Sequence, residues 1–192
     1  MGSEMKIIIG LLTLCTVLLF SCNTFKLSQS DLVWQPYKVG DILIFASNKS
    51  EFDTVTIKNI EKFNNPDDPL DVFPGINQSV FVSGDINILK LQADKNANSV
   101  EFELCLGHKE YRCPGTVLLL NQKEIGKLKK VKLGNKDVYK IMAIEFYDNM
   151  KDAPYDLEYI YWSMQYGYLG LQFKDQYLWE LKSFVREGKE IL

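Results

Sequence analysis

The sequence predicts an all-β fold, mainly an antiparallel meander of about nine or ten strands arranged as a barrel or a sandwich. Segments rich in β-branched and aromatic residues recur along the chain, and turn residues separate them at short intervals. In one segment Val55 and Ile57 alternate with Thr54, Thr56 and Lys58, which is typical of a strand with one buried and one wet face. The chain has 192 residues and no internal repeat, which favours one β domain.

We expect six strands and one long loop in residues 41–120. The strands are expected at residues 41–46, 52–60, 79–82, 87–91, 99–106 and 116–120. Residues 61–78 are expected to form the loop, because Pro66, Pro69 and Pro74 lack a backbone donor and restrict the residues before them.

We expect hairpins in residues 129–181. Gly134 and Asn135 are a two-residue turn signal between strands that are expected at residues 129–133 and 138–146. In the last predicted strand Tyr177, Trp179 and Leu181 share one face, so we expect Trp179 to be buried. The closing elements are expected to be strands at residues 158–164, 168–173 and 177–181 and a short helix within residues 182–192.

The chain begins with a segment that has the layout of an export signal. Lys6 precedes an apolar run at residues 7–20, which is shorter than the roughly 20 residues of a membrane-spanning helix. The run ends in Leu-Phe-Ser-Cys, which resembles the bacterial lipobox, where a small residue precedes the cysteine that receives lipid. We therefore expect cleavage before Cys22 and acylation of its thiol, since two or three acyl chains hold a protein firmly on a membrane. The alternative is an ordinary signal peptide followed by a structural cysteine.

This leader divides the chain into three expected parts. Residues 1–21 are the lipoprotein signal peptide, residues 22–33 a lipidated tether, and residues 34–192 a single β domain. The first expected partner is therefore a membrane, contacted through the acyl chains on Cys22.

Two cysteines are left for the exported domain, Cys105 and Cys113. An even pair in an oxidising compartment favours a disulfide, and the intervening residues include Gly107 and are able to close a hairpin. A metal site made by Cys105, His108 and Cys113 is the alternative, although their spacing matches no standard zinc pattern.

The composition disfavours several classes of function. The net charge is −3 and no basic stripe is evident, so nucleic acid is not an expected partner. The sequence has neither a phosphate-binding loop nor the glycine pattern of dinucleotide-binding proteins, and we expect no cofactor.

The sequence contains no clear catalytic constellation, and no catalytic residue is predicted. His108 is the only histidine, and the pattern Gly-x-Ser-x-Gly is absent. Glu101 and Glu103 share one face of a predicted strand, which suits glycoside hydrolysis but equally fits a wet surface. Loop aspartates form two further groups without the spacing of an EF-hand: Asp67, Asp68 and Asp71, and Asp148, Asp152 and Asp156.

The C-terminal third is unusually aromatic, and two interpretations are open. In the first, these side chains form a core with cross-strand aromatic pairs. In the second, they line a groove or cavity that binds an apolar or sugar-like ligand. The candidate binding aromatics are Tyr159, Tyr161, Trp162, Tyr166, Tyr168, Tyr177 and Trp179.

Two stretches of the chain carry a family resemblance. One is Trp-Gln-Pro-Tyr-Lys-Val-Gly-Asp at residues 34–41, and the other is Tyr-Trp-Ser-Met-Gln-Tyr-Gly-Tyr-Leu at residues 161–169. They resemble the opening W-x-P-Y-x-x-G and the closing Y-Y-S-x-x-Y-G-L of uncharacterised small envelope lipoproteins from Bacteroidetes-type bacteria. The chain departs from that pattern at Trp162 and at Tyr168. The resemblance implies an envelope location and brings no catalytic residues.

Together these observations predict an outer-membrane lipoprotein whose β domain binds an envelope component or an apolar ligand without catalysis. The residues after Cys22 lack the acidic run of surface-export signals in that group, so we expect the domain to face the periplasm. The alternatives are an envelope hydrolase that uses carboxylates or His108, and a structural subunit of a surface assembly.

Overall fold

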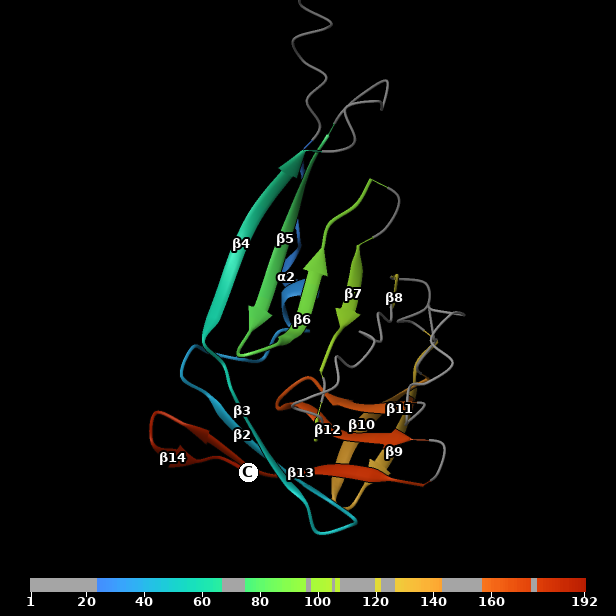
Figure 1. Cartoon of the computed structure of the whole chain (residues 1–192). Coiled ribbons are helices and arrows are strands. Elements are labelled where there is room, and N and C mark those ends of the chain that lie inside the picture. Colours follow the sequence, from blue (N-terminus) through green and yellow to red (C-terminus); the bar gives the residue numbers. More distant parts are fainter. Residues whose placement is uncertain are drawn as a thin grey trace, which may run out of the picture.

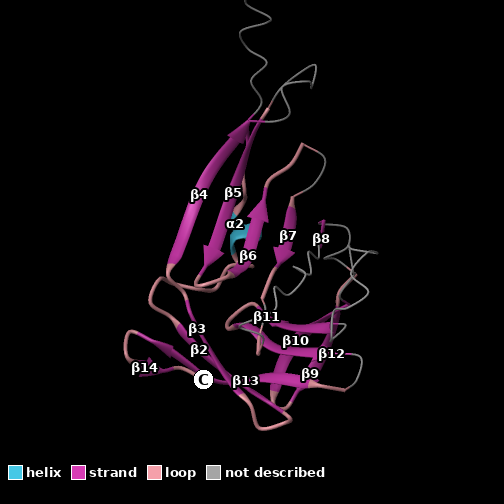
Figure 2. Cartoon of the chain, viewed as in Figure 1, coloured by secondary structure: helices cyan, strands magenta, loops and turns pink. Residues whose placement is uncertain are grey.

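The described part of the chain consists mainly of β-strands. The computed structural model describes residues 24–66, 75–95, 98–104, 106–107, 120–121, 127–142, 157–173 and 176–192. Within these residues the chain forms fourteen strands and one short helix, and the strands make a sheet of six and a sheet of eight (Figure 1, Figure 2). The predicted all-β class is confirmed.

The first sheet is built around β5 (Ile76–Ser83). One edge of β5 pairs with β4 (Asn59–Pro66), and the other edge pairs with β6 (Asn87–Gln92). β1 (Thr24–Phe25) runs parallel to the start of β5, on the edge opposite β4 and beyond the end of β6. The sheet continues from β6 through β7 (Ser99–Phe102) to β8 (Leu120–Asn121), and all these other pairings are antiparallel.

The second sheet is entirely antiparallel and combines strands from both ends of the chain. Its order is β3-β2-β13-β12-β11-β10-β9, and β14 pairs with the end of β13. The early strands are β2 (Ile42–Ser47) and β3 (Phe52–Thr56). The late strands are β9 (Lys129–Leu133), β10 (Lys136–Met142), β11 (Leu157–Ser163), β12 (Gly167–Phe173), β13 (Leu178–Arg186) and β14 (Lys189–Glu190).

The two sheets are joined where β3 continues into β4, which Figure 1 shows as one long run along the side of the molecule. Between these strands, Lys58 donates its backbone N–H to the carbonyl of Ser83 at 2.9 Å. Gly84 lies against this crossing, because a Cβ atom there would be 2.3 Å from the carbonyl oxygen of Thr56. Only a glycine allows the β5–β6 turn to approach the crossing strand so closely.

One hydrophobic core lies between the sheets. Phe102 of the first sheet packs edge-on against Trp162 of the second, with ring centroids 4.8 Å apart. Tyr168 of β12 lies 4.9 Å from Trp162 and donates its hydroxyl hydrogen to the carbonyl of Ile88, which belongs to the first sheet. Among the described strands neither sheet closes on itself, so the sandwich is the predicted arrangement that fits.

The predicted loop at residues 61–78 is wrong at both ends. β4 extends to Pro66 and β5 begins at Ile76, so residues 61–66 and 76–78 are strand. Pro66 is tolerated because it ends β4, which is an edge strand. On the unpaired side of an edge strand, a missing N–H removes no hydrogen bond between strands. The strand count also exceeds the prediction, because the expected strand at residues 52–60 divides at the crossing and three strands have only two residues each.

The predicted C-terminal helix is also wrong. β13 continues to Arg186 and is followed by a turn and β14. Ser183, Phe184 and Val185 pair with β2, and the Phe184 side chain is fully buried. Pairing and burial in the second sheet therefore override the weak local preference for helix.

Residues 24–33, where we expected part of the tether, pack on the first sheet. The short helix α2 (Gln29–Leu32) begins at Ser28, whose side chain and that of Asp31 form a capping box. Leu27 is buried, and Phe25 and Leu32 pack against the core. This segment is therefore part of the folded unit.

The position of Trp179 allows the core to be tested. Its side chain is 0% exposed, as its strand position predicted. We expect Trp179→Ala to lower the free energy of unfolding by about 3 to 5 kcal/mol, because a large side chain leaves a cavity. Urea denaturation measures this change. The matched control is Phe52→Ala, since Phe52 is 74% exposed on the same sheet and its truncation should cost less than about 0.5 kcal/mol. Similar losses for both variants would contradict the assignment of the core.

Candidate functional site

The candidate binding aromatics divide into a buried and an exposed group. Trp162, Tyr168, Tyr177 and Trp179 are buried in the core. Tyr159, Tyr161 and Tyr166 are partly exposed. The core interpretation therefore holds for the first group, and only the second group can contribute to a surface site.

Tyr37 connects the two stretches that resemble the lipoprotein family. It lies in the first stretch and contacts residues of the second. Its hydroxyl oxygen accepts the backbone N–H of Tyr168 at 2.9 Å, and its ring packs edge-on against Trp162 at 6.1 Å. A Cβ atom on Gly167 would lie 1.9 Å from this hydroxyl, and Gly167 has a φ of +76°, so both the contact and the backbone require glycine. Burial raises the pKa of Tyr37 well above its ordinary value, which keeps the phenol neutral.

The first stretch ends in a buried ion pair. Asp41 is 1% exposed, and both its carboxylate oxygens accept from Arg186, at 2.8 Å from Nε and 2.6 Å from Nη2. Arg186 Nη2 also donates to the carbonyl of Pro36 at 2.8 Å, and Asp41 accepts the backbone N–H of Lys38. These bonds satisfy the buried carboxylate and fix the loop to the last long strand. Both stretches therefore have a structural role.

A partly exposed polar and aromatic patch lies on the outer face of the second sheet. Tyr161 pairs directly with Lys140, and Tyr159 pairs directly with Met142, which is 64% exposed. Their neighbours Ile160 and Trp162 point into the core, so Tyr159 and Tyr161 face outward. We call this surface the outer patch and define it as Lys140, Met142, Tyr159, Tyr161 and Gln172.

Side chains of the outer patch contact one another. The Lys140 ammonium lies 3.6 Å from the ring centroid of Tyr159, a cation–π contact. The Tyr161 hydroxyl donates to Gln172 Oε1 at 2.5 Å. The charge of Glu158 raises the pKa of Tyr159, and burial raises the pKa of Tyr161, so both phenols are neutral donors at pH 7.

Tyr161 also has a structural role. It pairs with Gly170 across the strands, and a Cβ atom on Gly170 would lie 3.2 Å from Tyr161 Cδ2. The Tyr161 ring therefore packs over the backbone of Gly170, which has no side chain to cover it. Tyr159 is the better candidate for a contact residue, because its ring is not needed for this purpose.

The remaining aromatic candidates belong to turns. Tyr166 lies between β11 and β12 and packs against Phe184 at 6.4 Å. Tyr177 precedes β13, and its hydroxyl bonds to Glu51 of the β2–β3 turn. Burial and this carboxylate raise the pKa of Tyr177 to about 12. These contacts stabilise the turns that precede β12 and β13.

The glutamate pair of the sequence lies on the first sheet. Glu101 forms an ion pair with Lys90 at 3.2 Å. Burial and a hydrogen bond to Glu101 raise the pKa of Glu103. A raised carboxylate pKa also occurs in acid catalysts, but burial and the neighbouring Glu101 account for it here, while the charge of Lys90 acts in the opposite direction.

Several sequence candidates lie outside the described residues. These are Cys22, Cys105, His108, Cys113 and both groups of loop aspartates. Where the structure describes the chain, no group of three or more His, Cys, Asp or Glu side chains is placed to hold a metal ion.

A lysine-rich hairpin adjoins the outer patch, and our sequence analysis missed it. Residues 127–140 carry six lysines and one aspartate, a net charge of +5 in a chain whose net charge is −3. A count of charge per segment would have revealed it. The lysines lie on or beside β9 and β10: Lys127, Lys129, Lys130, Lys132, Lys136 and Lys140.

Comparison with known proteins adds no relative: no family model, no curated protein and no solved structure matches the chain. In the part of the chain that the structure describes, no helix has the length and apolar character needed to span a membrane. Function therefore has to be argued from the residues themselves.

The Tyr37 hydroxyl provides a test of the contact between the two stretches. Tyr37→Phe removes the acceptor and leaves the buried N–H of Tyr168 without its partner, which should cost about 1 to 3 kcal/mol of unfolding free energy. Tyr166→Phe is the matched control, because Tyr166 lies in a partly exposed turn, and it should change stability by less than about 0.5 kcal/mol. Urea denaturation of both variants decides, and an equal effect would refute this role of Tyr37.

Proposed function

We propose that the protein is a membrane-anchored bacterial lipoprotein whose β domain binds another component of the cell envelope through the outer patch, without catalysis. The observation that carries the binding part is the division of the aromatics. Four of the seven candidates are buried in the core, whereas Tyr159 and Tyr161 face outward beside Lys140.

A surface contact fits this arrangement better than an apolar cavity does. Trp162 and Tyr168 pack against each other and against Phe102, so their rings fill the space between the sheets. The outer patch combines an ammonium group, phenolic donors and an exposed methionine, which is typical of surfaces that contact a partner.

The anchor is supported by the leader and by the position of the first packed residues. The apolar run ends at Cys22, only three residues before Phe25, which already packs against the core. Three residues span at most about 10 Å, so lipid on Cys22 would hold this end of the domain close to the membrane.

Fatty-acid labelling tests the anchor. Cells fed an alkyne fatty acid should label the wild-type protein, and Cys22→Ala should abolish the label because the acyl-accepting thiol is gone. Cys105→Ala is the matched control and should label normally. Label that persists in Cys22→Ala would refute the anchor.

Site-specific crosslinking in cells tests the binding surface. A photoreactive phenylalanine analogue at Tyr159 should give a discrete adduct with another envelope component. The same analogue at Phe63, an aromatic residue that is 40% exposed on the other sheet, should give none. Tyr159 is suited to this replacement because its ring projects outward. No adduct at Tyr159, or equal adducts at both positions, would contradict the proposal.

A further inference from the structure

We infer that the lysine-rich hairpin and the outer patch together bind an acidic polysaccharide, a chain of sugars that carries carboxylate groups at regular intervals. This inference rests on the proposed binding function and names the chemistry of its partner.

Most lysines of the hairpin form no ion pair with another residue that the structure describes. Lys132 forms an ion pair with Asp137 at 2.7 Å. No ion pair to Lys127, Lys129, Lys130, Lys136 or Lys140 occurs among the residues that the structure describes. Such a concentration of one sign of charge attracts a partner of the opposite sign.

Protection of a sheet edge explains only part of this charge. β9 is an edge strand, and lysines on an edge strand discourage pairing with other chains. Lys140, however, lies on β10, which is paired on both sides, and it directly faces Lys129. Like charges directly opposite each other are destabilising, so edge protection gives no reason for this pair. An anionic ligand that bridges both ammonium groups explains why two lysines lie opposite each other.

The spacing of the lysines fits a polymer. Lys136 and Lys140 lie four residues apart on the same face of β10, which corresponds to about 13 Å along the strand. A single sugar ring is too small to reach both. A second row crosses the first at Lys140, since Lys129, Lys140 and Tyr161 are consecutive partners across three strands. Aromatic rings beside cations suit a ligand with apolar ring faces and anionic groups.

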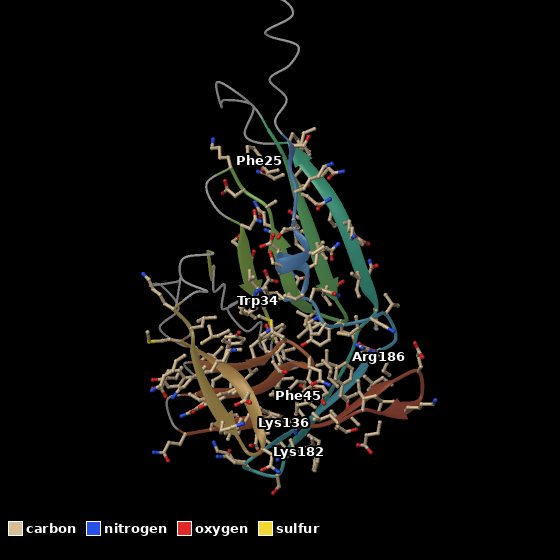
Figure 3. All side chains as sticks on the ribbon, turned by 180° about the vertical axis from the view of Figure 1, so that it is seen from behind. Phe25, Trp34, Phe45, Lys136, Lys182 and Arg186 are labelled. Atoms are coloured by element: carbon tan, nitrogen blue, oxygen red, sulfur yellow. The ribbon has the colours of Figure 1, made fainter. Side chains whose placement is uncertain are left out.

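The orientation separates this partner from the anchoring membrane. Figure 3 shows Phe25 at one end of the molecule and Lys136 toward the opposite end. If Cys22 carries lipid, the end with Phe25 lies at the membrane and the hairpin points away from it. The lysines are therefore presented to a polymer in the surrounding space and not to the headgroups of the same membrane.

Binding of polygalacturonate to the full lipidated chain, anchored in phosphatidylcholine vesicles, tests the inference. Fluorescent polygalacturonate should bind, and neutral dextran of the same length should not. The variant Lys129→Gln/Lys136→Gln/Lys140→Gln should bind polygalacturonate about tenfold more weakly. The matched control Lys26→Gln/Lys62→Gln/Lys189→Gln removes the same charge from exposed positions elsewhere and should stay within about twofold. The melting temperature should fall in neither variant.

A second comparison separates a glycan from an acidic protein. Tyr159→Ala should weaken the binding of polygalacturonate more than that of polyglutamate, because only the sugar polymer uses the ring. Equal affinity of the two polymers, an equal effect of Tyr159→Ala on both, or equal losses in the two triple variants would overturn the inference. If polygalacturonate fails to bind while the crosslinked adduct at Tyr159 persists, only this inference falls. If both fail, the proposed function falls as well.

Discussion

The Tyr37 hydroxyl accepts the N–H of Tyr168 at a point where β12 no longer has β13 as a neighbour. β13 pairs with β12 only from Gly170 to Gln172 and then continues along β2. The backbone of β12 before Gly170 therefore needs another partner, because a buried N–H without one is costly. A residue more than 130 positions earlier in the chain supplies it. That acceptor keeps its place because the Asp41–Arg186 ion pair fixes the loop on which it lies.

This constraint decides what the aromatic residues can do. With Tyr37 in place, Trp162 packs against it on one side and against Phe102 and Tyr168 on others, so the two sheets share one core. The Tyr168 hydroxyl then reaches Ile88 of the first sheet. Side chains that hold the sheets together in this way are unavailable to a ligand. Of the aromatic candidates, Tyr159 and Tyr161 are left on the outer face, beside Lys140.

Local patterns predicted some features well and failed where distant residues decide. The Gly134–Asn135 turn depends only on neighbours, and so does the alternation that buries Val55 and Ile57 and exposes Thr54 and Lys58. Both are present in the structure. The strand that replaces the expected C-terminal helix depends instead on pairing with β2, far away in the sequence. Period two shows which residues share a face, but it does not show which face a second sheet will cover. The division of the aromatics therefore needed the structure, whereas the lysine-rich hairpin was visible in the sequence.

The outer patch is positioned by the core. Lys140 precedes the buried Ile141 on β10, and Tyr159 precedes the buried Ile160 on β11. Ile141 and Ile160 are themselves directly paired, so packing on the inner face fixes the separation of the outer side chains. Successive side chains of a strand point to opposite faces, so residues fixed in the core also fix the backbone that carries the outer side chains. The same inner packing therefore determines the core and the positions of Lys140 and Tyr159.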